Sequence, residues 1–174
     1  EDASIPLAPN AGALTMSILS VEWSNLHRRL FEENFQELDH NNKIRFLTGS
    51  IIPAQFYYKA QKVRAVLQQQ ILDALQEVDV LVLPTGPVTA PPVEHSPGIQ
   101  SKEHALGGLA GRISFTGPFN LAGTPALSVP CGFSSTGMPM GLQIVGRPFA
   151  EETVLRVAYA YEQSTDWHTR RPPI

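Results

Sequence analysis

The sequence of 174 residues predicts an α/β layered fold, and two observations carry this prediction. Three substantial segments have apolar residues at helical spacing, and three short apolar runs bounded by turn residues have the character of strands. The two kinds of segment are mixed along the chain and do not form separate blocks. Strands this apolar need cover on their faces and edges, so we expect them to belong to a larger sheet.

Two helices are predicted in the first half of the chain. Segment 13–33 carries an apolar stripe at intervals of three to five residues, and segment 53–78 carries a longer one. Pro53 supports the start of the second helix, because proline is tolerated in the first turn. The polar segment between them, ELDHNNKIRFLTGS (37–50), is predicted to be a loop with a short turn of helix.

The next segments predict a strand and a long loop. DVLVLP (79–84) places four aliphatic residues between an acid and a proline, which is typical of a buried strand. Segment 85–111 is rich in proline and glycine and lacks periodicity. A loop of this length inside a compact domain is usually functional or mobile.

Segment 112–174 is predicted to form a short helix, two strands and a final helix. Thr116 is expected to cap the short helix, with Pro118 in its first turn and Gly123 at its end. ALSVP (126–130) and MGLQIVG (140–146) are the expected strands. Two glutamates at 151 and 152 favour a helix N-terminus, where negative charge is stabilising.

The composition excludes several classes of protein. The net charge is −3 and no basic stripe occurs, so we expect no nucleic-acid partner. No apolar run is long enough to span a membrane, and the single cysteine favours a reducing compartment, hence a cytoplasmic location. The five histidines lack metal-ligand spacing, Cys131 is interpreted as a packed thiol, and we expect neither a metal nor a cofactor.

Three stretches of the sequence resemble a known family. FNLAGTPALSVPCGF, followed by GMPMGLQIVGRPFAEETVLRVAYAYEQSTDWHTRRPP, resembles the C-terminal part of the amidase signature family. QFYYKAQKVRAVLQQQILDALQEVDVLVLPTGPVTAPP is similar to the region just upstream. The resemblance implies a three-layer α/β/α enzyme with a mixed β-sheet flanked by helices. It also implies hydrolysis of amide C–N bonds by a Ser-Ser-Lys triad, in which a neutral lysine activates the serines.

The signature region itself does not occur in this sequence. There is no GGSSGG-like loop, and the tandem serines Ser134 and Ser135 lie in a predicted turn. The four lysines fall on polar loops or on a helix face, so we assign no catalytic residue to this chain. The sequence begins without methionine, and we expect residues 1–174 to be the C-terminal portion of a single amidase domain.

The resemblance implies that this portion covers the cleft and shapes the substrate pocket. The expected wall is the turn that enters the short helix, with Ile113, Phe115, Thr116 and Pro118. Arg45 is a further candidate, because a guanidinium binds a carboxylate bidentately; the alternative is an ordinary surface arginine. Gln143 is expected to satisfy a buried hydrogen bond and not to contact substrate.

We compare three functions on the sequence and favour the first, with the other two as alternatives. The first is the C-terminal part of an amidohydrolase that acts on a small-molecule amide together with the missing N-terminal portion. The second is a catalytically empty binding module. The third is the glutamine-hydrolysing subunit of tRNA-dependent amidotransferases, which this chain resembles around YYKAQKVR. Those subunits usually carry an aspartate where this chain has Ile113, and an aliphatic side chain cannot pair with an ammonium group. The identity of the amide and the oligomeric state, including a homodimer, are left open.

Overall fold

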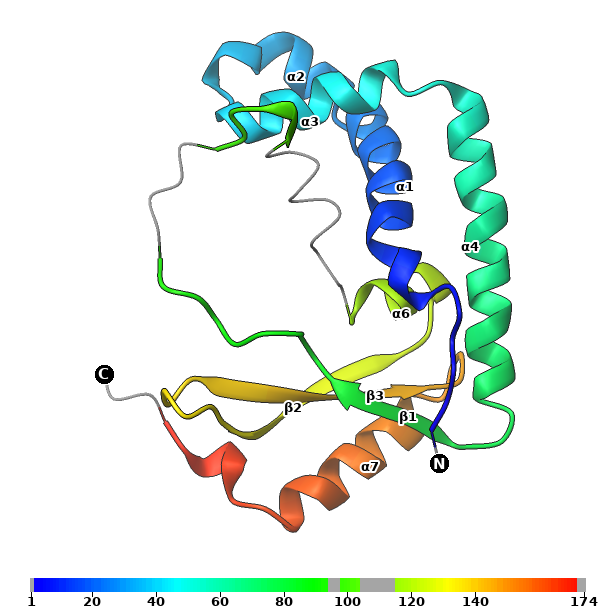
Figure 1. Ribbon diagram of the computed structural model, residues 1–174, viewed down its shortest axis with the longest axis vertical. Helices are drawn as coiled ribbons and strands as arrows, with labels where there is room; N and C mark the ends of the chain where they lie inside the picture. The colour runs from blue at the N-terminus through cyan, green and yellow to red at the C-terminus, as the bar shows by residue number, and fades with distance from the viewer. Residues whose placement is uncertain (1, 94–97, 104–114, 172–174) are drawn as a thin grey trace. The chain divides into compact units, whose positions relative to one another are not determined.

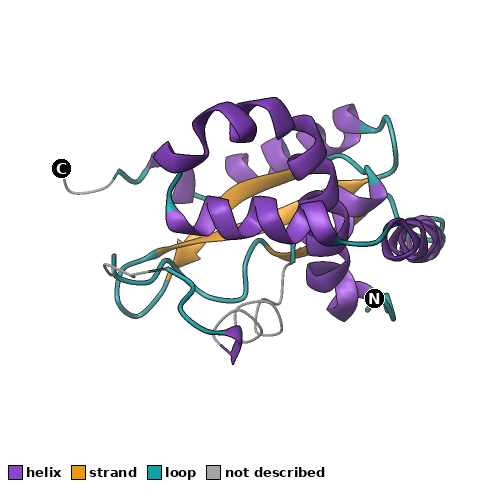
Figure 2. Cartoon of the chain, turned by 90° about the horizontal axis from the view of Figure 1, so that it is seen from above, coloured by secondary structure: helices purple, strands orange, loops and turns teal. Residues whose placement is uncertain are grey.

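The computed structural model describes residues 2–93, 98–103 and 115–171, and helix is the prevailing element in it (Figure 2). The chain divides into two compact units. The helical unit comprises Pro9–Val66 and Val93–Ile113, and the sheet unit comprises Glu1–Ala8, Leu67–Pro92 and Ser114–Ile174. Helix α4 (Ala54–Ala74) contributes to both. Within the described part of the chain, no helix is long and apolar enough to cross a membrane.

A 3-10 turn (Ala8–Asn10) leads from the sheet unit into the helical unit. Besides the first part of α4, the helical unit contains the helices α1 (Ala11–Leu26), α2 (Arg28–Asn34) and α3 (His40–Ile51). A 3-10 turn, Phe35–Glu37, connects α2 to α3. Small residues bring α1 and α3 close together: Gly49 is buried, and a Cβ added to it would lie 2.7 Å from the Ser20 carbonyl carbon and closer still to its oxygen. The Ser24 hydroxyl donates to the Phe46 carbonyl oxygen at 3.1 Å.

Helix α3 corrects the prediction of a loop over 37–50. Asp39 caps it, because its carboxylate accepts hydrogen bonds from the backbone N–H groups of Asn41 and Asn42 at 3.0 and 3.1 Å. These bonds satisfy donors that the first turn of a helix leaves unpaired. The polar residues that resemble a loop are therefore the capped first turn of a helix.

The predicted helix over 13–33 is divided at His27, which has φ −99° and ψ 13°. In a continuous helix, Trp23 and Phe31 would be about 12 Å apart along the axis. Their ring centroids lie 4.7 Å apart, and Phe31 also stacks on Phe46 at 4.3 Å. The break at His27 therefore allows an aromatic cluster to form across α1, α2 and α3.

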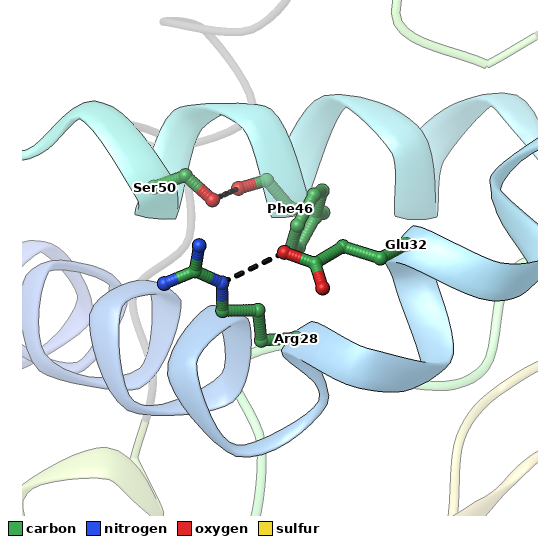
Figure 3. A network of polar contacts seen from close by, with 4 residues as sticks. All are labelled: Arg28, Glu32, Phe46 and Ser50. Atoms are coloured by element: carbon green, nitrogen blue, oxygen red, sulfur yellow. Dashed lines mark hydrogen bonds and ion pairs between the residues drawn. The ribbon is translucent and has the colours of Figure 1, made fainter.

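Polar contacts on the outside of the same helices are local. Figure 3 shows Arg28 paired with Glu32 one turn further along α2, at 2.8 Å, and the Ser50 hydroxyl donating to the Phe46 carbonyl oxygen at 2.8 Å. Both contacts are exposed, so they contribute little to stability.

The sheet unit contains β1 (Val80–Pro84), β2 (Ala126–Phe133) and β3 (Pro139–Gly146), together with α6 (Gly117–Ala122), α7 (Glu151–Gln163) and the 3-10 turn Trp167–Thr169. The strand order is β1-β3-β2, and both pairings are antiparallel. These elements confirm the α/β class and the strand predictions, with β2 running three residues further than expected and bulging after Pro130.

Helix α7 covers one face of the sheet (Figure 1). Val129 and Ile144 on the strands pack against Val154 and Ala158 on the helix, all of them buried. Side chains alternate between the two faces of a strand, so Gln143 lies on the face opposite α7. Residues 85–93 of the predicted long loop contain neither helix nor strand.

Helix α4 ends at Ala74, four residues before the predicted end at 78. Arg147, in the turn after β3, donates from Nε to the Leu75 carbonyl oxygen at 2.8 Å and from Nη2 to the Val78 carbonyl oxygen at 3.1 Å. These two carbonyl oxygens therefore accept hydrogen bonds from the Arg147 side chain and not from backbone N–H groups of a further helical turn. The arginine connects the end of α4 to the end of β3.

Candidate functional site

The candidate site is built around residues 115–118, which enter α6 and are called the Phe115 turn. Gly117 is the first residue of α6 and Pro118 the second; Gly123 ends the helix at φ 71°, in the left-handed region that favours glycine. Thr116 occupies the cap position, yet its side chain makes no capping hydrogen bond. Capping hydrogen bonds go to the N–H of the second or third helical residue, and Pro118 has none, so the predicted cap is only partly realised.

Gln143 joins the Phe115 turn to the centre of the sheet. Its side chain is 4% exposed, and Nε2 donates to the Phe115 carbonyl oxygen at 3.0 Å. Gln143 belongs to β3, which is paired on both sides, with Leu83 in β1 and Ser128 in β2 directly opposite. The structure therefore confirms the expected buried hydrogen bond and identifies its partner.

A pair of hydroxyl groups crosses β3 next to this bond. Thr85 Oγ1 and Ser128 Oγ lie 2.6 Å apart, although Thr85 follows β1 and Ser128 belongs to β2, the two strands that flank β3. They meet above Gly141, where an added Cβ would lie 2.6 Å from Ser128 Oγ and 2.7 Å from Thr85 Oγ1. The Thr85 N–H also donates to the Gly141 carbonyl oxygen at 2.8 Å. Sequence reasoning missed this hydroxyl bridge; the glycine in MGLQIVG is the one local signal for it.

The predicted wall residues differ in how accessible they are. Phe115 and Thr116 are half-buried, whereas Pro118 is buried. Ile113 lies outside the described residues. Phe115 and Thr116 are thus the predicted wall residues that are partly accessible, and the Phe115 carbonyl group, which directly precedes Thr116, is hydrogen-bonded to the sheet.

Arg45 lies on α3 in the helical unit and is exposed. Among the described residues, none forms a hydrogen bond or ion pair with its guanidinium, in contrast to Arg28 and Arg29, which pair with glutamates on α2. An exposed, unpaired guanidinium can accept a carboxylate ligand. The structure does not relate Arg45 to the Phe115 turn, because the two belong to different units.

Among the described residues, the side chains that form the Phe115 turn and its anchor are uncharged. Thr116, Gln143, Thr85 and Ser128 offer hydroxyl and amide groups, and none of them ionises near neutral pH. Such a surface suits hydrogen bonding to a neutral group better than pairing with an ion. Within the described residues, no group of three or more histidine, cysteine, aspartate or glutamate side chains could hold a metal ion.

A cavity of about 860 Å³ lies elsewhere in the sheet unit, along β1. Its walls are residues 2–5, the C-terminal part of α4, β1 and Phe119. The Leu7 N–H donates to Gln70 Oε1 at 3.0 Å and holds the N-terminal segment against α4. None of the predicted site residues lines this cavity.

An α/β chain with helices on a small sheet and a polar turn on one face is compatible with many enzymes, and comparison with known proteins identifies the class. The family model described as Amidase matches residues 7–155, a range that covers the helical unit, most of the sheet unit and the Phe115 turn. The chain belongs to the amidase signature family.

Curated relatives share high sequence identity with part of the chain. A glutamyl-tRNA(Gln) amidotransferase subunit from Synechococcus sp. (strain JA-2-3B'a(2-13)) is 52% identical over 125 residues, covering 68% of this chain and 22% of that protein. The corresponding protein from Geobacter sp. (strain M21) is 45% identical over 121 residues, covering 68% of this chain and 23% of that protein. The chain therefore spans less than a quarter of the length of these relatives.

Solved structures agree with the family assignment. A structure described as an amidase matches with a TM-score of 0.77 and 28% identity, covering 93% of this chain and 37% of that one. A glutamyl-tRNA(Gln) amidotransferase subunit from Thermotoga maritima matches with a TM-score of 0.65 and 28% identity, covering 92% of this chain and 34% of that one. A bacterial aryl acylamidase, at 19% identity and a TM-score of 0.73 over 99% of this chain and 38% of that one, supports the fold alone.

Proposed function

We propose that this chain is the C-terminal portion of one amidase domain, in a protein that hydrolyses the C–N bond of a small, neutral carboxylic amide. The nucleophile and base, a Ser-Ser-Lys triad in this family, lie outside residues 1–174 on this proposal. The chain contributes a substrate wall formed by Phe115 and Thr116, with Ile113 and Pro118 as further members of the same sequence segment.

The observation that carries this proposal is the uncharged, anchored Phe115 turn within the region that matches the amidase family model. A half-buried aromatic ring offers apolar contact to an acyl group, and hydroxyl and amide groups offer hydrogen bonds to a neutral amide. A free ammonium group would find no carboxylate among the described residues of this turn. These features favour a neutral substrate.

The test uses the protein expressed from its complete gene, with ammonia release measured on a panel of neutral amides such as hexanamide and benzamide. We expect turnover by that protein and none by residues 1–174 alone. Phe115→Ala should lower kcat/KM for the larger acyl groups by about tenfold, because it removes wall contacts. Phe133→Ala, at the far end of β2, is the matched aromatic control and should not alter the order of preference. Turnover by the 174-residue chain alone would contradict a triad outside it.

A second function, glutamine hydrolysis within a tRNA-dependent amidotransferase, is favoured by one specific observation. Arg45 is exposed and has no partner among the described residues, and a free guanidinium suits the α-carboxylate of glutamine. The high identity to the amidotransferase subunits adds support. The other components of an amidotransferase would then be the partners, and a homodimer would not be required.

Ammonia release from glutamine separates the two functions. If Arg45 binds a carboxylate, Arg45→Ala should raise the KM for glutamine at least tenfold and leave the KM for hexanamide unchanged. Arg156→Ala, an exposed arginine on α7, is the matched control. An unchanged KM for glutamine would exclude the carboxylate role and indicate an ordinary surface arginine, and an equal rise in KM for both substrates would exclude that role as well.

A further inference from the structure

Gln143 is a buried polar side chain in the middle of an apolar strand, between Leu142 and Ile144. Burying an amide is unfavourable unless it is hydrogen-bonded, and an apolar residue would be the simpler choice for a strand centre. Its Nε2 donates not to a neighbouring strand but to the Phe115 carbonyl oxygen, 28 residues away in sequence. The Gln143 side chain therefore bonds the Phe115 turn to the sheet.

We infer that Gln143 is a positioning residue for the substrate wall, holding Phe115 and Thr116 at a fixed place on the sheet; this inference rests on the proposed function. The anchor point is firm because β3 is hydrogen-bonded on both sides. The bonded carbonyl belongs to Phe115 itself and directly precedes Thr116. Any displacement of that carbonyl moves both wall residues together.

The hydroxyl bridge fixes the surroundings of this anchor. Ser128 is directly opposite Gln143 in the sheet, and its hydroxyl is held by Thr85, which follows β1. Gly141, two residues before Gln143 on the same face, leaves room for the bridge. Gln143 thus projects from a part of the sheet in which the two neighbouring strands are tied together across it.

Displacement of the substrate wall is expected to change KM and not kcat. A wall that holds the unreacting part of the substrate stabilises the bound substrate and the transition state equally, so its displacement raises KM and leaves kcat nearly unchanged. A loss of fold, by contrast, lowers the amount of active enzyme and therefore the apparent kcat. The two effects are separable in steady-state kinetics.

The experiment compares Gln143→Met, Gln143→Glu and the wild type, all expressed from the complete gene, with hexanamide as substrate. Methionine keeps the length and removes the donor, so we expect KM to rise about tenfold at nearly constant kcat. Ile144→Val is the matched control: it removes one buried methylene from the adjacent residue, on the face that contacts α7, and its KM should equal that of the wild type.

In the Gln143→Glu variant, the hydrogen bond to Phe115 can be removed and restored in the same protein by changing the pH. A carboxylate cannot donate to the Phe115 carbonyl, whereas a protonated carboxyl group can, and burial raises the pKa of such a group. The KM of Gln143→Glu relative to the wild type should therefore fall towards one as the assay pH is lowered from about 8 to about 5.5.

The outcomes distinguish this inference from the function beneath it. An active wild type with an unchanged KM in Gln143→Met, or a KM ratio in Gln143→Glu that stays equally far above one from about pH 8 to about pH 5.5, overturns the positioning role alone. A wild type that releases no ammonia from any amide of the panel refutes the proposed function, and the positioning role with it. Raised KM in Gln143→Met with low-pH recovery in Gln143→Glu supports both.

Discussion

Replacing Gly49 by alanine tests the close approach of α1 and α3. In an open helix interior, glycine to alanine stabilises by about 1 kcal/mol. Here the new Cβ would lie 2.7 Å from the Ser20 carbonyl carbon, about 0.7 Å short of the 3.4 Å at which ordinary contact begins. The obstacle is backbone and cannot rotate away, so the helices must separate.

The cost of that separation can be worked out from its parts. Overpacking costs about 1–3 kcal/mol, and stretching the hydrogen bond from Ser24 to Phe46 costs about 1 kcal/mol more. After subtracting the helix-propensity gain, we expect Gly49→Ala to lower the free energy of unfolding by about 1–3 kcal/mol. Urea unfolding followed by far-ultraviolet circular dichroism measures this quantity.

The neighbouring residue gives the control for this prediction. Ser50 is exposed on α3, and its hydroxyl bonds only within its own helix (Figure 3), so Ser50→Ala should change stability by no more than about 0.5 kcal/mol. A Gly49→Ala protein that is more stable than the wild type would refute this reasoning. It would show the increase in stability that alanine gives in a helix with no neighbouring backbone in the way.

Three further predictions concern other parts of the chain. Gly141→Ala should destabilise by about 1–2 kcal/mol in thermal melts, and Ser128→Ala in the same protein should recover part of the loss by removing the nearer hydroxyl. Backbone hydrogen bonding, chiefly from Asn42, lowers the pKa of Asp39 below its ordinary 3.8, so its stabilising effect is complete above that pH and is lost as pH falls through the lowered folded value. Asp39→Asn keeps a good cap and should flatten the melting temperature between about pH 5 and 2; a slope equal to the wild type would contradict this origin. Arg147→Lys should cost about 1–2 kcal/mol in urea unfolding, because one ammonium group cannot bond both carbonyl groups; an unchanged midpoint would argue against this connection.

Much of the fold follows from periodicity. The stripe of α4 and the apolar runs of β1 and β3 are local patterns, and each element has the predicted type. Helix α3 was not predicted, because its first turn is polar. Asp39 followed by two asparagines is as typical of a loop as of the capped N-terminus of a helix. The break at His27 depends on aromatic contacts across helices, which no local window contains.

The candidate site was predictable in part. The sequence indicated Phe115 and Thr116 through resemblance to a family, and it indicated that Gln143 must be bonded because a buried amide needs a partner. It could not name the partner, since nothing in a strand pattern specifies a carbonyl group 28 residues earlier. The hydroxyl bridge joins residues 43 apart, and only the sheet register brings them together.

The strand order also has a consequence for synthesis of the protein. β2 and β3 are neighbours in sequence, but β1 pairs with β3, and about 55 residues separate Pro84 from Pro139. A ribosome adding about 5–20 residues per second needs about 3–11 s to complete that interval. Throughout it, the aliphatic stretch Val80–Leu83 has been synthesised and the strand that will cover its edge has not, so the stretch leaves the ribosome without its partner. Such an edge is a ready substrate for a chaperone that binds extended apolar peptides, and slower translation across segment 85–138 would lengthen the time during which it is available.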